Sequence, residues 1–155
     1  MIAIYLNDHL AGSVAAVELA KRSAASNRGT SYGPFLDELA QEIEEDRQSL
    51  EEIMQALGVG IDRLKVAAGW TAEKLGRLKL NGRLLGYSPL SRVVELEALI
   101  LGVRGKLALW RSLEALEPEQ LAQARLTELV ARADRQLEGL ESHRLRAVED
   151  AFGSA

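Results

Sequence analysis

The sequence contains no cysteine, and it has only two histidines among its 155 residues. Without cysteine the chain can form neither a disulfide nor a thiolate nucleophile, and a zinc-thiolate site is excluded as well. Two histidines also leave few nitrogen ligands for a metal centre. Because the absence of cysteine fits a reducing compartment, we expect a cytoplasmic location.

Long apolar runs and basic tracts are missing too. No uninterrupted apolar segment approaches the roughly 20 residues that span a bilayer. Near the start, Asn7, Asp8 and His9 interrupt the apolar residues too early for a signal peptide. The net charge is -4, and no run of Lys and Arg with interleaved aromatics forms a basic groove. We therefore predict neither a membrane nor a nucleic acid as a partner.

What the sequence does contain is typical of long amphipathic helices. Its residues are 47% hydrophobic and 27% charged, which supplies one apolar core within a single domain of residues 1–155. Neither a phosphate-binding loop nor a Gly-x-Ser-x-Gly turn occurs, so nucleotide enzymes and hydrolases of that type are unsupported. The predicted class is all-α.

Apolar residues at helical spacing predict five helices, at about 2–25, 34–57, 61–79, 89–116 and 118–152. Pro34 and Pro89 suit first helical turns, Ser88 is a candidate N-cap, and Gly58 suits a helix end. The connection between the second and fourth helices spans about 30 residues. A crossover of that length lets these two helices run parallel.

Two helical hairpins joined by a long crossover resemble the ferritin-like superfamily. The segments YLNDHLAG and YSPLSRVVELEALILGVRGKLALW are similar to bacterial ferritin-like proteins of unsettled function. The resemblance implies an antiparallel four-helix bundle with an additional helix in the crossover. In catalytic members, one Glu from each of two helices and a Glu-x-x-His from each of the other two hold two metal ions.

Carboxylates recur where the resemblance places such a site. With antiparallel helices and a rise of about 1.5 Å per residue, four glutamates share one level of the bundle: Glu18, Glu42, Glu97 and Glu138. Glu42 and Glu97 lie nearest the apolar faces, so a metal-binding hypothesis depends on this pair, assisted by Glu18 or Asp46. Such a centre would hold iron or manganese in oxidase-like or metal-storage chemistry.

The family's histidine ligands are missing, however. Leu6 stands three residues before His9, and Leu140 stands three before His143, so neither histidine belongs to a Glu-x-x-His motif. Along their helices they lie about 13 Å and 8 Å from the carboxylate level. We expect His143 to face solvent and the bundle to be free of metal.

A second set of polar residues is predicted to point inward. Asp46 lies on the apolar stripe between Ile43 and Leu50, where an unpaired carboxylate would be strongly disfavoured. Lys106 and His9 fall near the same level, so we predict a buried network of His9, Asp46 and Lys106. Two interpretations stay open: the network fixes the helix register, or it forms a proton-transfer or ligand site.

The leading hypothesis is a non-enzymatic, metal-free ferritin-like bundle whose inward polar groups form salt bridges. Its predicted partner is an unidentified protein, with a homodimer as one form. The alternatives are the di-metal carboxylate protein and a binder of apolar ligands between the helices. Trp70 and Trp110 are expected to be packing residues.

Overall fold

A computed structural model describes residues 1–63 and 87–153 of the chain. Within these ranges it contains four helices and no strand: α1 (Ile2–Ser26), α2 (Gly33–Ala56), α4 (Pro89–Leu116) and α5 (Gln123–Phe152). The predicted all-helical class is confirmed for this part of the chain. The crossover helix predicted at 61–79, with Trp70, lies outside the described residues except for its first three positions.

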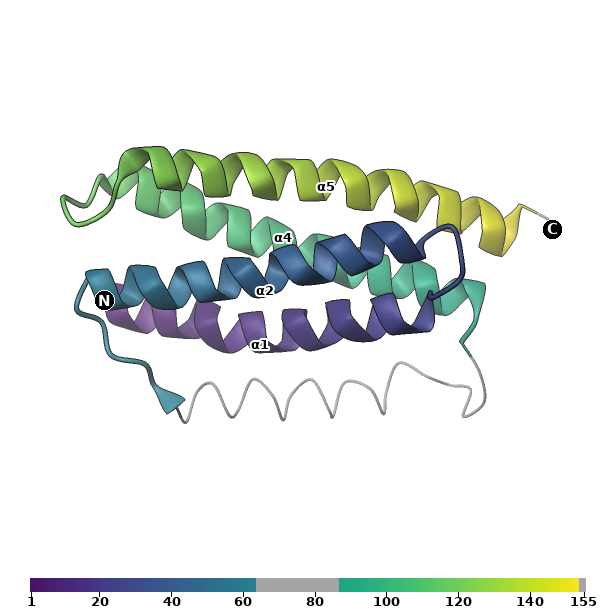
Figure 1. Ribbon diagram of the computed structural model, residues 1–155, viewed down its shortest axis with the longest axis horizontal. Coiled ribbons are helices and arrows are strands. Elements are labelled where there is room, and N and C mark those ends of the chain that lie inside the picture. Colours follow the sequence, from purple (N-terminus) through teal and green to yellow (C-terminus); the bar gives the residue numbers. More distant parts are fainter. Residues whose placement is uncertain (64–86, 154–155) are drawn as a thin grey trace.

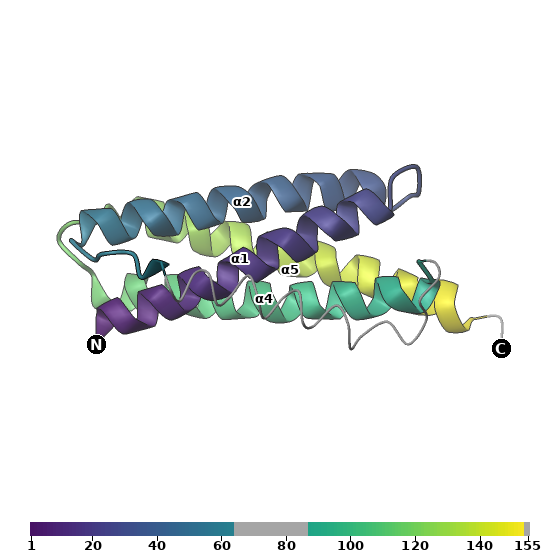
Figure 2. The same cartoon turned by 90° about the horizontal axis from the view of Figure 1, so that it is seen from below.

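The helices form two hairpins that pack against each other. Most contacts between helices are within the pairs α1–α2 and α4–α5, while α1 and α4 form the larger of the two contacts between hairpins. In Figure 1, α2 and α4 run in the same direction, and the two chain ends lie at opposite ends of the bundle. Figure 2 shows α1 crossing α4 at an angle. The described helices are thus compatible with a four-helix bundle.

Three of the predicted helix signals act as expected at the helix ends. Ser88 is the N-cap of α4: its Oγ accepts from Ser91 N at 3.1 Å, and Pro89 occupies the first turn. At the end of α2, Gly58 has a positive φ of 67°, which favours glycine. Val59 N then donates to Met54 O at 2.8 Å, so the last carbonyls of α2 are satisfied by a Schellman-type turn.

The predicted start of the last helix at residue 118 is wrong, because α5 begins at Gln123. Glu117 ends α4 with a φ of 44°, and Leu121 N donates to Pro118 O at 3.0 Å. Pro118 therefore belongs to a tight turn. A proline after a helix end can open a new helix or precede a turn, so the sequence signal is ambiguous here.

The core is built from leucine-rich stripes of all four helices around Trp110, which is 1% exposed. The expected packing role of Trp110 is confirmed by its burial. Its Nε1 has no hydrogen-bond partner in the structure as described. Of the described helices, none is both long and apolar enough to cross a membrane.

Asn7 of α1 forms hydrogen bonds to the segment that follows α2. The side chain is buried, its Nδ2 donates to Ala3 O at 2.9 Å and Gly60 O at 3.0 Å, and its Oδ1 accepts from Asp62 N at 2.7 Å. One amide thus satisfies three backbone groups on two segments.

An Asn7→Ala variant is expected to lower the free energy of unfolding by about 1–3 kcal/mol, since a buried side chain and its three hydrogen bonds to the backbone are lost. Urea unfolding followed by circular dichroism measures the change. Exposed Asp8, its neighbour, provides the matched control: an Asp8→Ala variant is expected to cost less than Asn7→Ala, because interactions of exposed charges contribute about 0–1 kcal/mol. Equal losses in both variants would contradict this role of Asn7.

Candidate functional site

Asp46 is the most deeply buried charged side chain in the described structure, with 2% of its surface exposed. It comes from α2, and its Oδ2 accepts hydrogen bonds from Lys106 Nζ of α4 and from Gln136 Nε2 of α5 at 3.2 Å. Its Oδ1 forms an ion pair with Arg132 of α5. The carboxylate therefore ties three helices and both hairpins together.

The partners of Asp46 are linked to one another. Lys106 Nζ donates to Gln136 Oε1 at 2.5 Å, and Gln136 Nε2 donates to Glu42 Oε2 at 2.8 Å. Burial lowers the pKa of Lys106 below its ordinary value, while attraction to Asp46 opposes that shift. The partners of Lys106 therefore stabilise its charged form and offset the cost of desolvation.

Sequence reasoning missed Gln136 and Arg132. Gln136 could have been found by the test that selected Asp46, because it lies on the apolar stripe of α5 between Ala133 and Leu140, both fully buried. Arg132 carries no comparable signal. Its side chain remains 20% exposed and also donates to Glu45 at 3.0 Å, as an ordinary surface arginine would.

His9, which was expected to join this network, lies apart from it. Its ring packs edge-on against Tyr5 with 4.7 Å between ring centroids. Within the described part of the chain, no hydrogen bond or ion pair joins His9 to Asp46 or Lys106. Burial lowers the pKa of His9, opposed by the charge of Asp8. Burial of the half-buried His9 ring therefore favours its neutral form.

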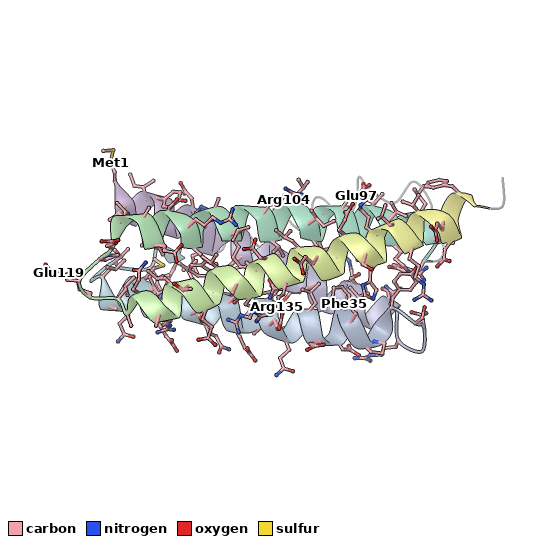
Figure 3. The ribbon with its side chains drawn as sticks, turned by 90° about the horizontal axis from the view of Figure 1, so that it is seen from above. Met1, Phe35, Glu97, Arg104, Glu119 and Arg135 are labelled. Atoms are coloured by element: carbon pink, nitrogen blue, oxygen red, sulfur yellow. The ribbon has the colours of Figure 1, made fainter. Side chains whose placement is uncertain are left out.

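The expected carboxylate layer does not converge. In Figure 3, Glu97 of α4 lies across α5 from α2, which carries Glu42, and both Glu97 and Glu138 are exposed. Glu18 and Glu42 are half-buried, and Glu42 is engaged by Gln136. Across residues 1–63 and 87–153, no group of three or more His, Cys, Asp or Glu side chains could hold a metal ion.

His143 is not the solvent-facing residue that was expected. Its ring stacks on Phe35 with 4.0 Å between centroids and 8° between planes, and its Nδ1 lies 2.8 Å from Gly139 O. Gly139 makes room for this stack, since a Cβ added there would lie 2.6 Å from the Phe35 ring. The missing side chain at Gly139 explains how His143 and Phe35 can meet at the α2–α5 contact.

A pocket of about 490 Å³ lies between α1, α2 and α4. Its deep part is formed by buried apolar side chains: Ile43, Leu50, Leu99, Val103, Leu109 and Trp110. Asp46 and Lys106 also line it, so the ion pair forms a polar spot within an otherwise apolar wall. The volume is within the range typical of small-molecule sites.

The outer part of the pocket is formed by exposed residues of α1 and α4. Gly12 of α1 and Gly102 and Gly105 of α4 line it together with Leu101, which is 71% exposed. A Cβ added at Gly12 or Gly105 would meet no atom within 4 Å. The glycines thus leave open space where other residues would place side chains.

A second polar cluster lies at the far end of the bundle. Asn27, fully buried, donates from Nδ2 to the Tyr87 hydroxyl at 2.7 Å and accepts from Arg92 Nε at 2.6 Å. The Tyr87 hydroxyl donates to Glu95 at 3.0 Å. Arg92 also covers the face of Tyr32, with its guanidinium carbon 4.3 Å from the ring centroid. All donors and acceptors just named are engaged with one another, so this cluster is a structural clamp.

Comparison with protein-family models, curated proteins and solved structures finds no match to this chain. The ferritin-like resemblance therefore stays a prediction. Function has to be argued from the site, because a helical bundle by itself hosts many activities.

The clamp should make alkaline stability depend on Tyr87. Burial raises the pKa of Tyr87 to about 12, and the nearby carboxylate of Glu95 adds to the shift. An unfolded tyrosine titrates near pH 10, so the stabilisation is complete below about pH 10 and is lost as the pH rises toward 12.

A Tyr87→Phe variant keeps the ring but removes the titrating hydroxyl. We expect its urea midpoint to fall less steeply than that of the wild type between about pH 10 and pH 12. Comparing the two slopes, with pH 7 as the reference for each protein, separates the titration from any loss of packing. Parallel slopes would show that Tyr87 does not carry the alkaline dependence.

Proposed function

We propose that this chain is a non-enzymatic binding protein whose site is the α1–α2–α4 pocket and whose ligand is an apolar small molecule. The observation that supports this most is the pocket itself, about 490 Å³ of mainly apolar space reaching Asp46 and Lys106. Burial of a ligand's apolar surface would supply its affinity.

The arrangement of polar groups favours binding over catalysis. Asp46 accepts from Lys106 and Gln136 at Oδ2, and its Oδ1 pairs with Arg132 without accepting a hydrogen bond. Two adjacent cations favour the charged carboxylate, which makes it a weak general base. His9, the other candidate base, lines the pocket and packs edge-on against Tyr5, and no hydrogen bond among the described residues orients its ring. The polar groups of the network are thus used to hold α2, α4 and α5 in register.

We also propose a ferritin-like fold, a cytoplasmic location and an unidentified protein partner, with a homodimer as one form. Ile4 of α1 and Leu101 of α4 are exposed apolar side chains, at 60% and 71%, that a partner would cover. Size measurement by light scattering at micromolar concentration tests self-association directly.

Titration with phenylnaphthylamine, a neutral apolar dye that fluoresces in dry sites, tests the proposed function. A Gly12→Leu variant should weaken dye binding by about tenfold or more, since the new side chain occupies the open space beside Gly12. The same change should not destabilise α1, because glycine costs a helix interior about 1 kcal/mol relative to leucine or alanine.

Gly12→Ala is the matched control, since it gives a similar gain in helix propensity but adds only one methyl group. We expect it to bind the dye nearly as well as the wild type does. A wild-type protein that does not bind the dye, or a Gly12→Leu variant that binds it unchanged, would overturn the proposed site.

A further inference from the structure

One N–H donor of Lys106 Nζ has no acceptor within the pocket. An ammonium group carries three N–H donors, and two of them are used by Asp46 Oδ2 and Gln136 Oε1. The third has no acceptor among the described residues, although the side chain is only 15% exposed and lines the pocket. A donor in that setting gains most from an acceptor that the ligand brings.

Trp110 also has an unpartnered donor, but one that is buried inside the wall. It follows Lys106 by four residues on α4, so the two side chains lie on the same face of the helix. Its ring forms part of the pocket wall, but Nε1 is buried and lacks a hydrogen-bond partner in the described structure, so a ligand in the pocket does not reach it. The free donor of Lys106 on an otherwise apolar wall is what favours a ligand that carries an oxygen acceptor.

Charge balance decides what kind of acceptor fits. The two cations Lys106 and Arg132 face three carboxylates of the same network, which are Asp46, Glu42 and Glu45. Arg47, the other cation lining the pocket, pairs with acids of its own helix at 2.7 Å and 3.4 Å. A ligand carboxylate would therefore place an uncompensated charge beside Asp46, which a weakly hydrated site disfavours.

We propose that the ligand of this pocket is a neutral, mainly apolar molecule whose carbonyl oxygen accepts a hydrogen bond from Lys106 Nζ. The ketone, aldehyde and ester classes share this chemistry. The proposal rests on the proposed function, because it specifies the ligand class of the same pocket. Lys106 selects the ligand, and the apolar wall supplies most of the affinity.

Three dimethylaminonaphthalene probes test the selection on the wild-type protein. They share the fluorescent ring system and differ only in one substituent, which is a propionyl, a propyl or a carboxylate group. We expect the propionyl probe to bind about tenfold more tightly than the propyl probe, the effect of one added hydrogen bond. The carboxylate probe should bind more weakly than either.

The outcomes separate the two proposals. Equal binding of the propionyl and propyl probes, or tightest binding of the carboxylate, overturns the carbonyl selection but leaves an apolar site. No binding by any probe overturns both.

A Lys106→Met variant, shown to be folded by circular dichroism, should bind the propionyl and propyl probes equally. A preference for the propionyl probe that survives in this variant would rule out Lys106 as the selecting group. The wild-type comparison stands alone if the variant does not fold.

Discussion

Replacing Asp46 with alanine is expected to lower the free energy of unfolding by about 3–5 kcal/mol, a loss typical of breaking a buried ion pair. The carboxylate is 2% exposed, and its removal leaves Lys106 and Arg132 without the anion that compensates them. This loss arises mainly because the two cations stay in a poorly hydrated environment without a counter-charge, and less because their attraction to Asp46 is lost. Urea unfolding at neutral pH measures it.

Two further variants test that explanation. An Asp46→Leu, Lys106→Met double variant removes the anion and one cation together, and should recover part of the stability that Asp46→Ala loses. Glu45→Ala removes an exposed acid that also pairs with Arg132, and should cost less than about 1 kcal/mol. A small loss in Asp46→Ala, similar to that of Glu45→Ala, would contradict the buried-pair argument.

Trp110→Ala is the second change with a large expected effect. The side chain is almost fully buried between the hairpins, and truncating a buried tryptophan costs about 3–5 kcal/mol through lost apolar burial and the cavity left behind. Guanidinium unfolding followed by circular dichroism measures the loss. Because Trp110 lines the pocket, the same variant should enlarge the binding space.

A Trp110→Phe variant distinguishes the stability contributed by the aromatic ring from that contributed by the indole N–H group. Phenylalanine keeps an aromatic side chain, and no hydrogen bond to Nε1 is lost, since that atom lacks a partner in the described ranges. We expect a markedly smaller loss of stability than in Trp110→Ala. Similar losses in the two variants would mean that the indole N–H has a partner that matters for stability.

The helices could be predicted from the sequence because their signals are local. Apolar spacing and end signals such as Ser88 and Gly58 depend on neighbours along the chain. The start of α5 could not be predicted in this way, since Pro118 suits a turn as well as a helix. The contact between Asp46 and Lys106 follows from two local facts, a buried stripe position on α2 and a shared level along the bundle.

The glutamate layer and the place of His9 could not be predicted in the same way. A level along the bundle follows from the rise per residue, but the direction of a side chain depends on how each helix is rotated and how helices cross. Glu97 shares the level of Glu42 and still points to solvent. The pocket depends on the same crossing of α1 and α4, which no single segment encodes.

The uneven distribution of contacts between the helices has a consequence for the order of assembly. Contacts are concentrated within each hairpin, so most of the structure forms between segments that are close along the chain, which favours fast folding of each hairpin. Docking of the hairpins comes later, and it must bring Asp46 of one hairpin to Lys106 and Arg132 of the other while water leaves. The slowest step of folding is then expected to be the desolvation of these charges, and hydrophobic collapse of either hairpin would precede it.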